Sequence, residues 1–126
     1  MIRLAAGAAL LLALPACATA EASPQFAGLY RINQMEMAGG LELRADGRFR
    51  YALDYGAVSE EAEGKWAAEG NTVLLTTDPM PPAAECDRGF ASACFNRTPL
   101  TIEEENLILW RWDAKIRLKP VQPRPR

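Results

Sequence analysis

The cysteines are the residues of this chain whose type and spacing most readily suggest chemistry. The sequence contains three, Cys17, Cys86 and Cys94, and it contains no histidine. Cys86 and Cys94 are separated by eight positions, whereas redox-active pairs usually have the closer spacing of a Cys-x-x-Cys motif. A metal pair would need further soft ligands, and none lies near these cysteines in the sequence. We therefore predict a structural disulfide between Cys86 and Cys94, which favours an oxidising compartment.

The absence of histidine excludes the most common catalytic arrangements. Neither a Ser-His-Asp triad, a Cys-His pair nor a histidine-ligated metal site can be built. The serines lie outside any Gly-x-Ser-x-Gly elbow, at Ser23, Ser59 and Ser92. The acidic residues Asp78, Glu85 and Asp87 could attract calcium, but their spacing is unlike that of an EF-hand loop. We predict no metal, no cofactor and no enzyme activity.

Two clusters of carboxylates remain as candidate acid-base groups. They are Glu60-Glu61 with Glu63, and residues 103–105. A glycosidase needs two carboxyl groups that face each other across a cleft. Consecutive residues of a strand point to opposite faces, and these clusters lie beside expected turns. We therefore interpret both clusters as solvated edges of a sheet.

The charge is nearly balanced overall but uneven along the chain. Lys and Arg number 14 and Asp and Glu 16, so the net charge is −2, which gives no basic footprint for nucleic acid. Residues 54–105 carry 11 acidic and 3 basic residues, a net charge of −8, whereas residues 111–126 carry 6 basic and 1 acidic residue, a net charge of +5. The basic end could contact anionic lipid headgroups. We favour charge complementarity between neighbouring strands.

The N-terminal segment has the pattern of an export signal. Arg3 precedes an apolar run over residues 4–14, which is too short for an ordinary membrane span and ends at Pro15. Cleavage after the Ala18-Thr19-Ala20 motif would release a mature chain of 106 residues into the periplasm. Alternatively, Leu14-Pro15-Ala16-Cys17 resembles a lipobox, although Pro15 is unusual there. Lipidation of Cys17 would make the protein an outer-membrane lipoprotein, attached only by its lipid anchor. A buried N-terminal helix of the mature fold is the remaining alternative.

The mature chain has the texture of short β-strands. Residues 48–55 alternate between apolar and polar side chains, and Asp46-Gly47 marks a hairpin turn between this strand and residues 41–44. No window has a sustained helical apolar stripe. The remaining expected strands cover residues 28–33, 61–68, 72–77, 99–102, 107–112 and 115–121.

Eight short strands joined mostly by tight turns predict an all-β fold. We expect one up-and-down antiparallel eight-stranded barrel, or a closely related sandwich, over residues 28–121. Residues 1–20 would be the cleaved signal peptide, 21–27 an exposed tail, and 122–126 a basic, proline-rich tail. A long loop over residues 78–98 carries the disulfide and two exposed-looking aromatic residues, Phe90 and Phe95. Such a loop could be a pinned connection over one barrel end, or a lid or partner-contact loop.

Aromatic residues at inward-facing positions have two interpretations. They could line a pocket for an apolar ligand, or they could form the packed core that a protein of this size needs. The strand over residues 107–112 is apolar on both faces, so it is either covered on both sides or partly exposed. The candidate ligand-binding residues are Tyr30, Phe49, Tyr51, Tyr55, Trp66, Phe90 and Trp110.

Several motifs between residues 28 and 77 occur together in exported barrel proteins. Gly28-Leu29-Tyr30 is followed by a Leu-x-Leu-x-x-Asp-Gly-x-Phe pattern over residues 41–49, and then by Gly64-Lys65-Trp66 and Val73-Leu74-Leu75. This segment resembles small lipocalin-like, calycin-type β-barrel proteins of the bacterial cell envelope. The resemblance implies a barrel with a binding role. The Cys-x-x-Cys motif of the copper-resistance lipoproteins in this group is missing here.

The sequence thus favours a non-enzymatic envelope protein. We expect it to bind a small apolar ligand or an envelope protein at the barrel end near the Cys86–Cys94 loop. As an alternative, its size, strand number and single disulfide are similar to those of periplasmic protease inhibitors. These proteins act through an N-terminal tail, which here would be residues 21–25, and an interaction protein could also act through its loop.

Overall fold

The described residues form nine β-strands, most of which alternate between buried and exposed positions, and one short helix. The structure is a computed structural model, and it describes residues 23–86 and 91–122. In chain order the elements are β1 (Gly28–Gln34), β2 (Met37–Leu43), β3 (Arg48–Tyr55), β4 (Val58–Glu69), β5 (Thr72–Thr77), α1 (Ala83–Cys86), β6 (Ala91–Ser92), β7 (Thr98–Glu103), β8 (Asn106–Arg111) and β9 (Ala114–Pro120).

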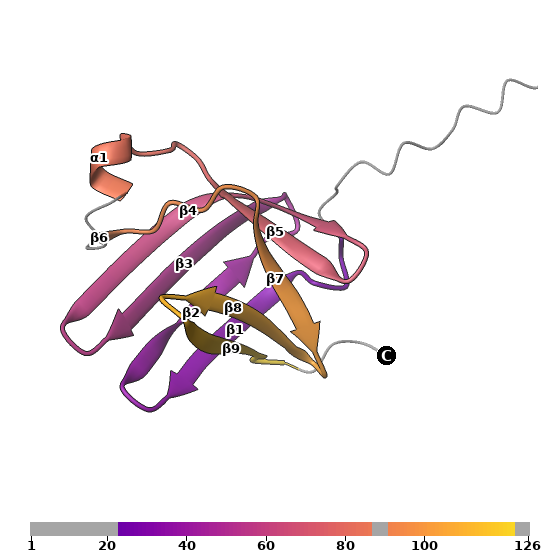
Figure 1. The fold of residues 1–126 in the computed structure, drawn as a ribbon. Coiled ribbons are helices and arrows are strands. Elements are labelled where there is room, and N and C mark those ends of the chain that lie inside the picture. The colour runs from indigo at the N-terminus through magenta and orange to yellow at the C-terminus, as the bar shows by residue number, and fades with distance from the viewer. Residues whose placement is uncertain (1–22, 87–90, 123–126) are drawn as a thin grey trace, which may run out of the picture.

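Eight of these strands close into an antiparallel barrel (Figure 1). The sheet order is β3-β2-β1-β9-β8-β7-β5-β4, and β3 also pairs with β4, which closes the ring. Closure removes the exposed edges that an open sheet would have. The predicted all-β, eight-stranded barrel is therefore confirmed, and β6 adds a ninth strand that pairs in parallel with β4.

The hairpin predicted at Asp46-Gly47 joins β2 to β3. The amide of Arg44 donates to the carbonyl of Arg48 at 2.9 Å, and Gly47 has a φ of 86° that favours glycine. The predicted strands all occur, although β2 and β4 begin earlier than expected, at Met37 and Val58. Turn chemistry and a period of two residues were thus sufficient to predict the barrel strands.

Strand β4 is the longest strand and it changes partners along its length. Its first part, residues 58–65, pairs with β3, and residues 64–69 pair with β5. A Cβ at Gly64 would lie 2.0 Å from the carbonyl oxygen of Thr76, so only glycine permits this close approach. Because β5 does not extend along the first part of β4, that edge is left for β6, whose Ala91 and Ser92 pair with Glu60 and Glu61.

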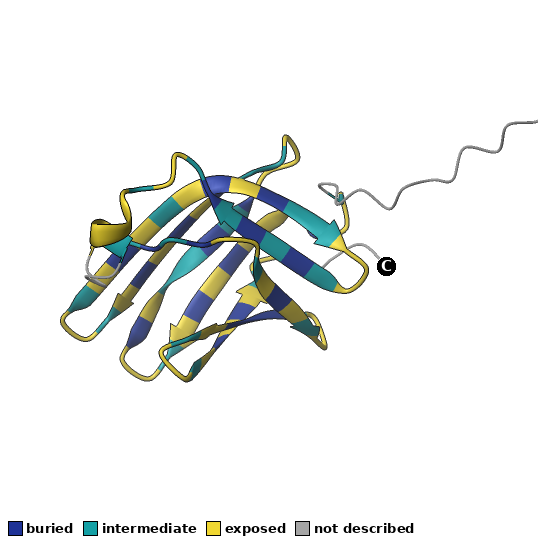
Figure 2. Ribbon diagram, turned by 45° about the horizontal axis from the view of Figure 1, so that its top comes forward, coloured by how far each residue is buried: buried dark blue, intermediate teal, exposed yellow. Residues whose placement is uncertain are grey.

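Inward-facing side chains from every strand of the barrel pack its interior. Figure 2 shows buried and exposed positions alternating along the strands. Buried polar groups find partners there: the indole of Trp66 donates to the carbonyl of Arg44 at 2.8 Å. The completely buried residues include Phe49, Val73, Leu75, Leu100, Leu107, Leu109, Ile116 and Leu118.

Residues 21–27 were predicted to form an exposed tail, but part of this segment is buried. Phe26 is 1% exposed and belongs to the hydrophobic core. A turn places it there, since its amide donates to the carbonyl of Ser23 at 3.0 Å, and the hydroxyl of Tyr30 donates to the carbonyl of Phe26 at 2.7 Å. The predicted signal peptide, Cys17 and the last four residues lie outside the described residues.

Candidate binding site

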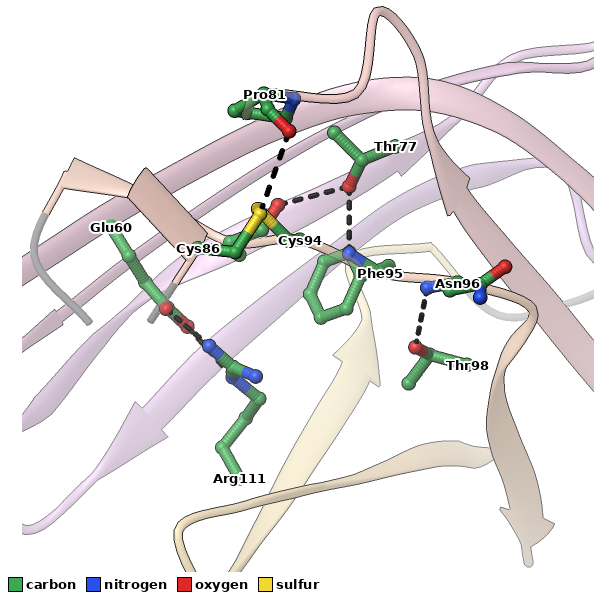
Figure 3. Close-up of a disulfide and its surroundings, with 10 residues drawn as sticks. Glu60, Thr77, Pro81, Cys86, Cys94, Phe95, Asn96, Thr98 and Arg111 are labelled. Atoms are coloured by element: carbon green, nitrogen blue, oxygen red, sulfur yellow. Dashed lines mark hydrogen bonds and ion pairs between the residues drawn. A yellow bond between two sulfur atoms is a disulfide. The ribbon is translucent and has the colours of Figure 1, made fainter. Parts of the chain in front are cut away.

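The loop after β5 is fastened to the barrel at Thr77. The amide of Thr77 donates to the carbonyl of Phe95 at 2.9 Å, and its hydroxyl donates to the carbonyl of Ala93 at 2.9 Å. The amide of Phe95 donates back to that hydroxyl at 2.8 Å (Figure 3). The predicted disulfide is present, with the Cα atoms of Cys86 and Cys94 5.5 Å apart. The loop is therefore held at both its start and its end.

Phe95 is an anchor of this loop rather than an exposed aromatic residue. It is 1% exposed and lies against two inward-facing rings of β3. Its ring centroid is 5.1 Å from that of Tyr51, in an edge-to-face arrangement, and 6.1 Å from that of Phe49. The expectation of exposure was wrong because the side chain packs into the hydrophobic core against these two rings.

Glu60 is a buried carboxylate, so its interpretation as part of a solvated edge was also wrong. It is 1% exposed. Its Oε1 accepts hydrogen bonds from the Tyr51 hydroxyl at 2.8 Å and from Arg111 Nε at 3.0 Å, and its Oε2 accepts one from Arg111 Nη2 at 2.6 Å. Burial, followed by the negative charge of Glu60, raises the pKa of the Tyr51 phenol well above its usual value.

The guanidinium of Arg111 lies over two aromatic rings. It lies 5.4 Å from the ring centroid of Phe95 and 4.7 Å from that of Trp112, and Trp112 stacks on Tyr55 with centroids 6.4 Å apart. Figure 3 shows the Glu60–Arg111 pair and Phe95 near the disulfide. Both oxygens of the buried carboxylate are satisfied within the protein, which favours a structural role for this cluster.

The sequence-predicted ligand residues do not meet in one cavity. Tyr30, Phe49, Tyr51 and Trp66 belong to the core, and Tyr55 is half-buried beside Trp112. Trp110 is 59% exposed on the outer face of β8, whereas Ile108 on that face is 2% exposed. The inward orientation considered for Trp110 was therefore wrong, because Leu107 and Leu109 are the inward residues of this strand. Phe90 lies outside the described residues.

A groove of about 680 Å³ lies on the outer face of the barrel, over β1, β2, β3 and β4. In each of β2, β3 and β4 it is lined by two outward-facing residues and by the inward-facing residue between them. The disulfide loop borders the same groove through Pro79, Pro81, Ala91 and Ser92. The outward-facing lining residues of the strands are Leu29, Gly40, Glu42, Arg50, Ala52, Glu61 and Glu63.

Small residues form the floor of this groove. Gly40 pairs with Ala52 and Ala52 pairs with Glu61, so the two small residues lie side by side across β2 and β3. A Cβ at Gly40 would lie 2.8 Å from the carbonyl oxygen of Tyr30, which keeps this position free of a side chain. Of the predicted ligand residues, Tyr30 and Tyr51 border the groove. Sequence reasoning missed the groove because it considered the inner faces of the strands only.

The chain has no significant match to a protein-family model, to a curated protein or to a solved structure. Within the described residues, no cluster of acidic and cysteine side chains is arranged to hold a metal ion. No helix in this part of the chain is long and apolar enough to cross a membrane. The fold is thus described from the structure alone, as a closed eight-stranded antiparallel barrel with one additional strand.

Proposed function

We propose that this protein is a non-enzymatic binding module of the bacterial cell envelope, and that its partner occupies the outer groove beside the disulfide loop. The observation that carries the proposal is the groove itself. Its volume of about 680 Å³ lies within the roughly 300–1,000 Å³ range of ligand pockets. Export is supported by the leader-like residues 1–20 and by the Cys86–Cys94 disulfide.

The packing of the barrel favours the outer groove over an interior site. Four of the seven aromatic residues expected to line a pocket belong to the core, and the hydroxyl of one of them, Tyr51, donates a hydrogen bond to Glu60. These four are Tyr30, Phe49, Tyr51 and Trp66. An internal ligand would have to displace Phe95, which is completely enclosed near the barrel end. Small barrels are commonly filled by their own side chains. A partner at the groove needs no such rearrangement.

A library of random decapeptides, displayed on phage and selected on the folded protein, tests this proposal. Ala52→Arg fills the groove floor, and Thr101→Arg makes the matched change at an exposed position of β7. We expect selected peptides to bind the wild-type chain and the Thr101→Arg variant but not the Ala52→Arg variant. Binding that survives Ala52→Arg, or no selection above the background of uncoated wells, would overturn the proposal. Circular dichroism and a denaturant midpoint check that both variants are folded.

A further inference from the structure

We propose that the occupant of the groove is an extended, cationic peptide segment of a partner protein. This inference rests on the proposed function, and it adds the chemical class of the partner. Three features of the groove carry it: its charged wall, its length across the sheet and the apolar residues near its ends.

The charged wall of the groove carries more carboxylates than cations. Glu42 pairs across the strands with Arg50, and Arg50 pairs with Glu63, which makes one charged row. Glu61 adds a third carboxylate beside Ala52, so the lining has three negative charges against one positive charge. Within residues 23–86 and 91–122, none of these four side chains forms an ion pair. A basic partner would complement this lining, whereas an anionic one would be repelled.

Two cations near the groove, Arg48 and Lys65, are already engaged by a carboxylate outside its lining. Asp78 lies 3.3 Å from the guanidinium of Arg48 and 3.7 Å from the ammonium of Lys65. The Arg48 guanidinium also donates to the carbonyl of Asp78 at 3.0 Å. Asp78 therefore holds Arg48 and Lys65, while Arg31, which pairs with Gly40 from β1, is a further cation beside the β1 end of the groove.

The groove has the length of a short peptide. One row of paired residues crosses the groove through Gly40, Ala52, Glu61 and Ser92, one residue on each of four neighbouring strands, and Arg31 of β1 lies beyond Gly40. Five strands at a spacing of about 4.8 Å span about 19 Å, which is the length of about six extended residues. A compact inorganic cation would leave most of this length empty.

The peptide would cross the strands rather than join them. The backbones of β2 and β3 are paired on both sides, so they offer no free edge for strand addition. Recognition must therefore come from side chains, and lysines or arginines of the peptide would meet Glu42, Glu61 and Glu63. Apolar surface lies near the ends of the groove, where Leu29 is 56% exposed and Pro81 is half-buried. Alternating basic and apolar residues suit such a site.

Fluorescence anisotropy with two labelled hexapeptides tests this inference. The first is Lys-Ala-Lys-Leu-Lys-Ala, and the second has glutamate at each lysine position. We expect saturable binding of the lysine peptide to the wild-type protein, at least about tenfold tighter than binding of the glutamate peptide, and weakening as salt is raised from about 10 mM to about 500 mM. Equal affinity for the two peptides, or no binding of the lysine peptide, would overturn the cationic assignment.

Charge reversal tests whether the lysine peptide binds in the groove. Glu61→Lys combined with Glu63→Lys should weaken binding of the lysine peptide by about tenfold. The control combines Glu104→Lys with Glu105→Lys, exposed positions at the turn between β7 and β8, and it changes the net charge by the same amount. We expect this control to bind almost as the wild-type protein does. Equal losses in both double variants would show attraction to the overall charge, and they would contradict the inference.

A free polyamine would offer the same charges without a peptide backbone. We expect spermidine to displace the lysine peptide only at concentrations far above that of the peptide. Displacement at comparable concentrations would overturn the peptide assignment in favour of a polyamine. If the lysine peptide fails while library peptides of other charge are blocked by Ala52→Arg, the cationic inference fails and the groove function stands. Peptide binding that Ala52→Arg does not affect would contradict both the cationic inference and the proposed groove function.

Discussion

Glu60 of β4 and Arg111 at the end of β8 form a bidentate ion pair across a part of the barrel where their strands do not pair. The two hydrogen bonds measure 3.0 and 2.6 Å, and the carboxylate is completely buried. In the sheet order, β7 and β5 lie between these two strands. The pair therefore links β4 to β8 through side chains, beside the ring of Phe95.

Removal of Glu60 should destabilise the protein strongly. Glu60→Ala leaves Arg111 and the Tyr51 hydroxyl without their shared acceptor, and we expect a loss of about 3 kcal/mol in the free energy of unfolding. Urea denaturation monitored by tryptophan fluorescence measures it. The exposed neighbour provides the control, because Glu61→Ala should cost about 0.5 kcal/mol or less. Similar values for the two variants would mean that the pair contributes nothing to the barrel end.

Phe95 and Trp110, whose burial was predicted wrongly from the sequence, should differ strongly in what their truncation costs in stability. Phe95→Ala removes a ring enclosed by Phe49, Tyr51 and Arg111, and it should cost about 3–5 kcal/mol. Trp110→Ala removes a side chain that is 59% exposed, and it should cost about 0.5 kcal/mol or less. Denaturant midpoints of both variants test the assignment. A larger effect at Trp110 than at Phe95 would contradict it.

The disulfide should stabilise the loop and, through Phe95, the barrel. The bridge joins residues with a sequence separation of 8. Closing this short loop lowers the conformational entropy of the unfolded chain. Removal of the disulfide should therefore lower the free energy of unfolding by about 2–3 kcal/mol. Cys86→Ser combined with Cys94→Ser is compared with the wild-type protein by urea denaturation, with and without dithiothreitol. Dithiothreitol should destabilise the wild-type protein only; a matching effect on the double variant would contradict the prediction.

Tyr51 should make the protein sensitive to alkaline pH. In an unfolded chain a tyrosine ionises near pH 10, whereas burial and Glu60 raise the pKa of Tyr51 in the folded protein. The unfolded chain therefore releases this proton first. The contribution of Tyr51 to stability is complete below about pH 10 and is lost as the pH rises toward the folded pKa. We expect the unfolding free energy to fall less steeply between about pH 9 and about pH 11 in Tyr51→Phe than in the wild-type protein. Parallel pH profiles would rule out this role.

Local sequence signals predicted most of the barrel. Period-two alternation identified β3, and the Asp46-Gly47 turn fixed its register with β2, because both depend on neighbouring residues only. The cysteine spacing likewise predicted the disulfide. These features require no knowledge of the distant parts of the chain.

The contacts around Glu60 and Phe95 join residues that are far apart in the sequence, so no local sequence pattern could predict them. Glu60 and Arg111 are 51 positions apart, and a glutamate beside two others has the same sequence pattern whether it is buried or solvated. Phe95 lies in a proline-rich loop, where alternation gives no information about burial. The groove was missed because it combines the outer faces of four strands with a distant loop.

The most direct test of the proposed binding role is an amide chemical-shift map of the ¹⁵N-labelled protein with the lysine hexapeptide. We predict that the largest shift changes lie at groove residues, among them Gly40, Ala52 and Ser92, and that interior residues such as Phe49 and Leu75 change little. Changes centred on the interior residues, or spread evenly over the barrel, would contradict it.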